Sequence, residues 1–405
     1  MGFNPLQEKG ISLEKQIRNW SELNVAPYDK NQVDPYTQCR VITMNGIEVE
    51  GSLFSHQFAR HTPDLELKRQ LAMVRRIEQQ QQKAINWLTP GEASPLEVTI
   101  GYEQVAVDLT AWVAQNEPDA YARQCYEFGL LEDFDHLYRY ANLMDLLEGK
   151  KAEKIVKDLT EVMPGRATIL EHRHPHDDVR KPLKLGVSHP ISHLHALTIT
   201  AAEQQTMNFY MNIGNRPTEP LARGLYLEIA QIEEQHVTHY ESMQDASASW
   251  AEMLLLHEYN ECYLYYSFMQ GEVDPRIRNI WELHLGMEIE HLRLACDLFR
   301  SIEKKDPESV LPRELPEVVQ FKSNKEYVRK VLETQVDLSA DLTEFVPMDQ
   351  LPEGHRFHQY QKAVHGDGPV PSEAVIEEHK RTAGGEYRVQ PGGPHPVASA
   401  RTAAE

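Results

Sequence analysis

The sequence has few cysteines and no long hydrophobic run. Its four cysteines, Cys39, Cys125, Cys262 and Cys296, form no Cys-x-x-Cys pair, so they predict neither a disulfide framework nor a zinc or iron–thiolate site. No stretch approaches the roughly 18 uninterrupted apolar residues of a membrane-spanning helix. The N-terminus lacks the basic start and apolar core of a signal peptide. We therefore expect a cytoplasmic protein that does not bind membranes.

Positive charge is also scarce. The 405 residues contain 41 Lys and Arg against 62 Asp and Glu, which gives a net charge of −21 at pH 7. Such a surface repels the phosphate backbone of nucleic acids and anionic lipid, so neither is an expected partner. Hydrophobic residues make up 41% of the chain, which is enough for a sizeable core and excludes global disorder.

The pattern along the chain predicts an N-terminal appendage, a helical domain, a helical C-terminal extension and a flexible tail. These segments cover residues 1–60, 61–305, 306–363 and 364–405. In the appendage, polarity alternates around Asn45-Gly46, a strong short signal for a β-hairpin. Helical periodicity dominates the second segment. The last segment is rich in Gly, Pro, Ser and Ala and has little apolar content, which is typical of a mobile tail.

One helical hairpin recurs three times in the helical domain. Each copy carries a Glu on its first helix and, thirty positions later, an acid-x-x-His pair on its second helix. Such internal repetition is a stronger signal than any single motif. The nine residues, copy by copy, are Glu103, Asp133 and His136; Glu203, Glu233 and His236; and Glu258, Glu288 and His291.

The spacing predicts that each set of three meets in space. Residues i and i+3 share one helix face, so a carboxylate and an imidazole at this spacing point the same way. A turn near the midpoint of thirty residues brings the first Glu level with that pair. Two hairpins then supply four carboxylates and two imidazoles, and this oxygen and nitrogen set suits iron or, alternatively, manganese.

Solvated helix faces can produce the same pair by chance. With 62 acids in 405 residues, an acid precedes roughly 3 of the 19 histidines by three positions at random. The acids of the second and third copies, however, lie on the apolar stripes of their helices. A buried unpaired carboxylate costs several kcal/mol, so a core that holds several of them favours bound cations.

These motifs resemble the ferritin-like di-iron carboxylate superfamily over roughly residues 95–303. In that superfamily a four-helix bundle holds two metals with a Glu from each of two helices and Glu-x-x-His from each of the other two. The resemblance implies an all-α, ferritin-like four-helix bundle with an additional helical hairpin, beside the small N-terminal β-hairpin. It implies two bound iron ions, with manganese as the alternative. Its implied ligands are Glu103, Asp133, His136, Glu203, Glu233 and His236, with Asp133 where Glu is usual.

Connection lengths favour a site built from the first two copies. The second and third helices of such bundles run parallel and need a long crossover, which residues 150–190 can provide. Only 22 positions separate His236 from Glu258, so the third copy must follow by a short antiparallel turn. Its residues Glu258, Glu288 and His291 then belong to a decayed, second-site or dimer-forming element. Pairing of the first copy with the third keeps the right helix directions and is the alternative.

Two further clusters are interpreted as solvated polar surfaces. Glu78-x-x-Gln81 matches the repeated motif weakly and lies among four successive glutamines, as expected for an exposed helix face. The histidines and aspartates from His172 to Asp178 fall in the crossover and are read as a polar loop, with a role in guiding metal or protons as the alternative.

The resemblance implies an oxidoreductase that activates dioxygen or peroxide and oxidises a small organic substrate. No flavin, nicotinamide or iron–sulfur motif is visible, so electrons would come from a separate donor protein or from the substrate. A ferroxidase or metal-storage protein is the alternative, and a non-catalytic helical scaffold is the second alternative. A homodimer is compatible with the third hairpin.

Overall fold

The computed structural model describes residues 3–401, and this part of the chain is mostly helical. It contains fourteen α-helices and one small antiparallel sheet, formed by β1 (Leu338–Asp341) and β2 (Glu344–Pro347). The expectation of a mainly helical protein is confirmed. No helix in residues 3–401 is long and apolar enough to cross a membrane.

The chain divides into two compact units, each assembled from separate stretches. Unit 1 consists of Met1–Glu92, Pro182–Ala202 and Gln244–Phe321. Unit 2 consists of Ala93–Lys181, Glu203–Met243 and Lys322–Glu405. Units of this kind arise because helices that pack together come from distant parts of the sequence. The two units therefore do not coincide with the four consecutive segments expected from composition.

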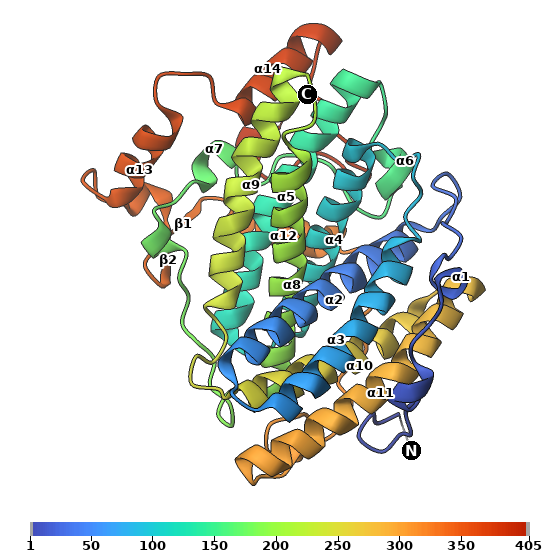
Figure 1. Cartoon of the computed structure of the whole chain (residues 1–405). Helices are drawn as coiled ribbons and strands as arrows, with labels where there is room; N and C mark the ends of the chain where they lie inside the picture. The colour runs from blue at the N-terminus through green and yellow to red at the C-terminus, as the bar shows by residue number, and fades with distance from the viewer. Residues whose placement is uncertain (1–2, 402–405) are drawn as a thin grey trace. The chain divides into compact units, whose positions relative to one another are not determined.

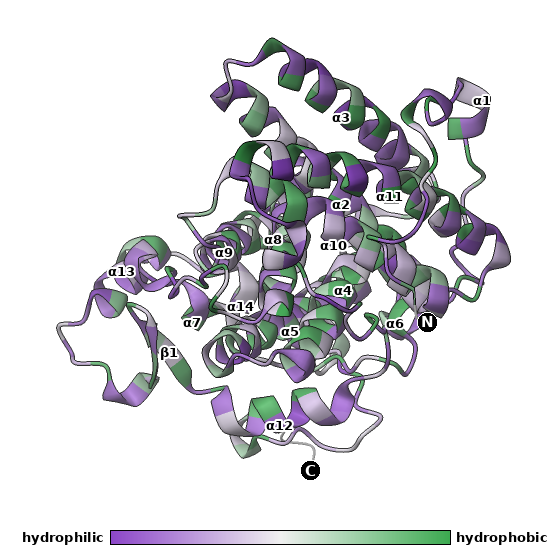
Figure 2. Cartoon of the chain, turned by 90° about the horizontal axis from the view of Figure 1, so that it is seen from below, coloured by the Kyte–Doolittle hydropathy of each residue, from purple (hydrophilic) through white to green (hydrophobic). Residues whose placement is uncertain are grey.

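Two helical hairpins form most of unit 1. One joins α2 (Pro35–His61) to α3 (Leu65–Asn86), and the other joins α10 (Trp250–Gly271) to α11 (Pro275–Glu303). The helices of each hairpin lie side by side, and α2 also contacts α10 (Figure 1). Hydrophilic and hydrophobic residues alternate around α3 (Figure 2), as expected for a helix that buries one face. The short α1 (Trp20–Leu23) contacts α3.

The predicted N-terminal β-hairpin is wrong, because Asn45-Gly46 lies in the middle of α2. Asp34 caps this helix by accepting hydrogen bonds from the backbone N–H groups of two following residues, and Pro35 occupies its first position. The Asn45 side chain accepts a hydrogen bond of 2.7 Å from Gln82 on α3. Packing along most of α2 outweighs the local turn preference of Asn-Gly.

Unit 2 is built around α4 (Pro95–Asn116), α5 (Ala120–Glu148), the second half of α8 (Pro190–Ile213), and α9 (Pro220–Glu241). The α5 helix contacts both α4 and α9. Shorter helices complete the unit: α6 (Glu153–Val156), α7 (Thr168–Glu171), α12 (Lys325–Gln335), α13 (Arg356–His365) and α14 (Pro371–Ala383). Both α12 and α14 pack on α5.

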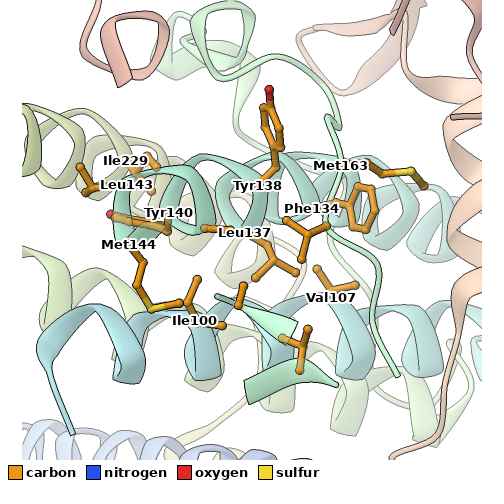
Figure 3. Packing of buried hydrophobic residues seen from close by; sticks show 14 of the residues in the cluster. Ile100, Val107, Phe134, Leu137, Tyr138, Tyr140, Leu143, Met144, Met163 and Ile229 are labelled. Carbon is orange, nitrogen blue, oxygen red and sulfur yellow. The ribbon is translucent and has the colours of Figure 1, made fainter. Parts of the chain in front are cut away.

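Apolar side chains of α4 and α5 form the centre of the unit 2 core. Figure 3 shows Ile100 and Val107 of α4 facing Leu137 and Phe134 of α5. All four are at most 1% exposed. This packing fixes α4 against α5, and so fixes the helix faces that carry the predicted ligands.

The expected flexible tail instead contributes to this core. Val375 and Ile376 of α14 are buried in the same cluster. Tyr387, beyond that helix, is also buried, and its backbone N–H donates to the Asn142 side chain at 2.7 Å. The tail prediction is therefore wrong over these residues, because average composition does not register a few apolar residues aligned on one helix face.

Candidate metal centre

Six buried side chains from four helices meet inside unit 2. Each is at most 1% exposed. They are Glu103 on α4, Asp133 and His136 on α5, Glu203 on α8, and Glu233 and His236 on α9. These are the six residues of the first and second hairpin copies. We call them the unit 2 centre.

The centre contains two overlapping groups of ligand-type atoms. Within each group, one atom from every residue lies within 4.8 Å of all the others. One group consists of Glu103, Asp133, His136 and Glu233, and the other of Asp133, Glu203, Glu233 and His236. Each group therefore offers three carboxylates and one imidazole, and Asp133 and Glu233 belong to both.

Both histidines turn Nδ1 towards the carboxylates of the centre. His136 Nδ1 is 3.1 Å from Glu233 Oε1, and His236 Nδ1 is 3.2 Å from Asp133 Oδ1. On the other side of each ring, Nε2 is 2.9 Å from a further buried carboxylate, Glu171 for His136 and Glu132 for His236. Metal-binding histidines commonly donate their second N–H to such a partner, which fixes the ring orientation.

Several polar atoms of the centre lack a hydrogen-bond partner within the described residues. They are both carboxylate oxygens of Asp133, one oxygen each of Glu103, Glu203 and Glu233, and Nδ1 of His236. Buried polar atoms are nearly always paired, so a convergent set of unpaired ones requires an explanation. Metal cations would satisfy these atoms, and the donor set fits iron or manganese.

Charge repulsion within the centre is strong. Burial, reinforced by neighbouring carboxylates, raises the pKa of Glu103 and of Glu203 well above the usual range. Burial also raises the pKa of Glu233, but the neighbouring His136 and His236 outweigh this effect and lower it to about 2. Without metal, protons on the two histidines therefore balance part of the negative charge, and cations would displace them.

Residues of the crossover support the centre from outside. Glu132, next to the ligand-type Asp133, accepts hydrogen bonds from Arg166 at 3.0 Å and from Arg173. Burial raises the pKa of Glu132, but these arginines and His236 lower it well below its usual range. Arg166 also lies over the Phe128 ring, 3.9 Å from its centroid. The crossover thus holds Glu132 charged, as an acceptor for His236.

A close backbone approach places the crossover at this point. The Gly165 N–H donates to Asp135 Oδ1 at 2.9 Å. A Cβ on Gly165 would overlap the carbonyl oxygen of Leu131 and lie 2.8 Å from the Asp135 nitrogen. Only glycine fits here without displacing the neighbouring Arg166.

One tyrosine contacts a predicted ligand directly. The Tyr210 hydroxyl on α8 donates a hydrogen bond to Glu103 Oε1. Its ring lies 5.2 Å from that of Tyr140, which lies 5.0 Å from Tyr226. The Tyr226 hydroxyl pairs with Thr99 at 2.7 Å. These rings form a buried aromatic cluster beside the Glu103 end of the centre.

The third hairpin copy lies elsewhere. Glu258, Glu288 and His291 belong to α10 and α11 of unit 1, and none of them joins either group of the unit 2 centre. The structure therefore brings together the first and second copies rather than the first and third. Glu78 and Gln81 of α3 are buried in unit 1, so the expectation of a solvated face is wrong for both.

The polar loop predicted from His172 to Asp178 is a network of ion pairs. Asp177 is grouped with Asp341 and His355, but Arg356 pairs with both aspartates and supplies the neutralising charge. Asp178 pairs with Arg173 at 3.1 Å. These contacts are structural and leave no need for a cation.

Sequence reasoning missed the outer partners of the histidines. Glu171, Arg166 and Arg173 sit in an irregular connection that carries no periodic signal. Glu132 could have been noticed only as a second acid beside Asp133. Comparison with known proteins adds nothing to these residues, since no protein-family model, curated protein or solved structure matches the chain.

Proposed function

We propose that unit 2 is a ferritin-like four-helix bundle that binds two iron ions, or manganese ions, and that the chain is an oxidoreductase which activates dioxygen or peroxide. The proposal rests on one observation. Two imidazoles and four carboxylates converge in a buried space, and several of their atoms have no hydrogen-bond partner among the described residues. Repelling carboxylates in a core are unfavourable without cations, which favours a metal centre over a structural scaffold.

Each metal position would receive one glutamate and one histidine of its own, and both would share Asp133 and Glu233. The residues specific to the two positions are Glu103 with His136, and Glu203 with His236. Ions held in this way supply redox chemistry towards dioxygen or peroxide. The protein residues keep the centre buried and hold each histidine with Nδ1 inward. Tyr210 keeps a hydroxyl proton beside Glu103, where it can serve proton transfer.

A small organic compound is the proposed substrate, and a separate donor protein or the substrate itself would supply electrons. Neither follows from the geometry of the centre alone. Both rest on the resemblance of the ligand pattern to di-iron carboxylate enzymes and on the absence of flavin, nicotinamide or iron–sulfur motifs in the sequence.

The test compares metal content and oxygen consumption in matched variants. Protein purified without chelators should hold iron or manganese, and the double variant His136→Ala/His236→Ala should lose the pair of ions in unit 2. The variant His358→Ala, which changes an exposed histidine on α13, should keep them. Chemically reduced wild-type protein should consume dioxygen, whereas the double variant should not.

Other outcomes would contradict the proposal. Wild-type protein with no bound transition metal would favour the scaffold. Continued uptake of many iron ions per chain, with no turnover of an organic substrate, would favour ferroxidase or storage activity.

A further inference from the structure

A second buried cluster of carboxylates lies in unit 1. It consists of six residues that are each at most 4% exposed. They are Glu48 on α2, Glu78 on α3, Glu258 and Glu261 on α10, and Glu288 and His291 on α11. We call them the unit 1 cluster. One group of mutually close ligand-type atoms comes from Glu78, Glu258 and His291, and a second from Glu48, Glu261 and Glu288.

The spacing of the unit 1 cluster repeats that of the unit 2 centre. Glu48 and Glu78 are 78 − 48 = 30 positions apart, as are Glu103 and Asp133. The α2–α3 hairpin is therefore a fourth copy of the repeat, with Gln81 at the histidine position. Unit 1 pairs the fourth and third copies as unit 2 pairs the first and second.

Hydrogen bonds around the unit 1 cluster also match those of unit 2. His291 Nδ1 is 2.9 Å from Glu288 Oε2, and its Nε2 is 2.8 Å from Gln16 Oε1. The ring therefore faces the cluster with Nδ1 and is held from behind, as His136 is. The Tyr265 hydroxyl donates to Glu48, and Tyr210 donates to Glu103 in the same way. Tyr265 stands seven positions after Glu258 on α10, and Tyr210 stands seven positions after Glu203 on α8.

Two residues make the unit 1 cluster richer in oxygen. At the position of His136 stands Gln81, which donates to Glu288 Oε1 at 2.6 Å. At the position of Thr206 stands Glu261, which adds a carboxylate. One group thus combines two carboxylates with an imidazole, and the other contains carboxylates alone.

Unpaired atoms in the cluster provide a second, independent observation. One oxygen each of Glu48, Glu78, Gln81, Glu258 and Glu261 is buried without a hydrogen-bond partner among residues 3–401. None of the five glutamates forms an ion pair with Lys or Arg in that part of the chain. Five carboxylates and one imidazole therefore share a buried space with no Lys or Arg side chain in contact, which is unfavourable unless cations or protons are bound.

An apolar cavity of about 360 Å³ leads to the histidine-containing group. Glu258 and His291 form part of its wall, and aliphatic side chains of α3, α10 and α11 form much of the rest. These include Leu67, Leu71, Leu254, Leu294 and Leu298. A few convergent polar groups in an apolar cavity are typical of a ligand or metal site. The cavity places Glu258 and His291 of this group beside an open space.

We propose that unit 1 holds a second two-cation site, separate from the one proposed for unit 2. The position formed by Glu78, Glu258 and His291 would take iron or manganese. The position formed by Glu48, Glu261 and Glu288 would take a hard divalent cation such as Mn²⁺, because carboxylate oxygens are the ligands that such cations prefer.

The experiment titrates the full, metal-free chain with Mn²⁺ and counts bound ions by equilibrium dialysis and electron paramagnetic resonance. Wild-type protein should bind one pair of ions per unit. The double variant Glu258→Gln/His291→Ala should lose one ion, or bind it more than about 10-fold more weakly. The double variant Glu48→Gln/Glu261→Gln should lose the other ion of this pair. As a control, Glu282→Gln changes an exposed acid on α11 and should leave binding unchanged.

The unit 2 variant His136→Ala/His236→Ala separates this inference from the proposed function. If both hold, this variant loses only the unit 2 ions, and the unit 1 variants lose only the unit 1 ions. Bound Mn²⁺ that disappears in the unit 2 variant and is unaffected by the unit 1 variants would overturn the second site and leave the proposed function standing. The reverse pattern would support the second site and contradict the proposed function.

Two single variants guard against misfolding as the cause of metal loss. Glu261→Gln removes one of five repelling carboxylates with little change in volume, so the metal-free melting temperature should not fall while Mn²⁺ binding weakens. Gln81→His restores the imidazole found in unit 2 and should raise binding of Co²⁺ relative to Mn²⁺, because imidazole suits Co²⁺ better than an amide. An unchanged ratio for Gln81→His would contradict the assigned position.

Discussion

The carboxylate of Glu171 lies 2.9 Å from Nε2 of His136, although Glu171 belongs to the short α7 helix of the crossover. Burial, only partly offset by His136, raises the pKa of Glu171 to about 8. The contact fixes the imidazole with Nδ1 towards the unit 2 centre. Glu171, which is not among the proposed metal ligands, therefore controls the orientation of His136, which is.

Replacing Glu171 should weaken metal binding without removing a ligand. We expect Glu171→Ala to lower the affinity of unit 2 by about 10- to 100-fold, the usual effect of losing the outer partner of a histidine ligand. Glu171→Gln keeps an acceptor oxygen and should have a smaller effect. Competition with a chelator measures both, and Leu170→Ala, on the same helix and 38% exposed, is the control. Equal affinity in the wild type and Glu171→Ala would show that the contact does not position His136.

The Glu132→Gln variant should strongly destabilise the fold. Glu132 neutralises Arg166 and Arg173, and all three side chains are buried. Removing one partner of a buried ion pair typically costs about 3–5 kcal/mol, because the remaining charge has no partner. Urea denaturation of the metal-free protein measures the change. Glu234→Gln, on the exposed face of α9, should have little effect, and a similarly small change for Glu132→Gln would contradict the role assigned to the pair.

Substitution of two acids of the unit 2 centre should affect the stability of the metal-free protein differently. Glu233 accepts a hydrogen bond from His136 and has a pKa of about 2, so Glu233→Gln should lower the free energy of unfolding by about 1–3 kcal/mol. The pKa of Glu203 is raised well above its usual range by burial, so Glu203→Gln should not destabilise the fold. Thermal unfolding after chelation distinguishes the two. Equal destabilisation by both variants would contradict the charge pattern.

Metal-free protein should become less stable as the pH rises from roughly 5 to 8. Burial and nearby carboxylates keep the pKa of Glu103 and Glu203 above that of an unfolded chain, and nearby carboxylates overcome burial to raise the pKa of His136 and His236. The two glutamates therefore hold more protons in the folded state from about pH 5 upwards, and the two histidines from about pH 6 upwards, so the unfolding free energy falls with pH. Melting temperatures of chelated protein measure the slope. Added Mn²⁺ should flatten it, because bound cations replace the protons.

The Gly165→Ala variant should disturb unit 2 through the crossover. The added methyl group meets the Leu131 backbone, which cannot move aside easily, and overpacking of this kind typically costs about 1–3 kcal/mol. The shift should also loosen Arg166 and weaken metal binding in unit 2. Gly91→Ala is the matched control, since a Cβ there meets nothing within 4 Å. Equal melting temperatures for the two variants would contradict the close approach.

The unit 2 residues could be predicted because their arrangement follows from regular helix geometry. Thirty positions with a turn between them place Glu103 level with Asp133 whatever the side chains around them. The same rule applied to Glu78 would have identified Glu48. The Asn45-Gly46 turn signal concealed Glu48, because the local turn preference of Asn-Gly suggested a hairpin where helix packing decides the structure.

Other parts of the fold depend on contacts between residues that are distant in sequence. Glu171 reaches His136 only because the crossover folds back along α5, and the irregular residues 150–190 carry no period from which this could be inferred. The buried α14 helix was missed for a related reason. Its few apolar residues, Val375 and Ile376 among them, matter through the core that they meet rather than through their number.

The nested order of the hairpins determines when the partners of each hairpin become available during synthesis on the ribosome. The ligand-type residues of unit 2 span Glu103 to His236, whereas those of unit 1 span Glu48 to His291. Glu48 and Glu78 therefore leave the ribosome first but meet their partners last. From Glu78 to Glu258 is 258 − 78 = 180 residues, which takes roughly 10–35 s at usual elongation rates. During this interval the acidic face of the α2–α3 hairpin lacks the helices that later bury it. The hairpin must therefore avoid aggregation while this face is uncovered.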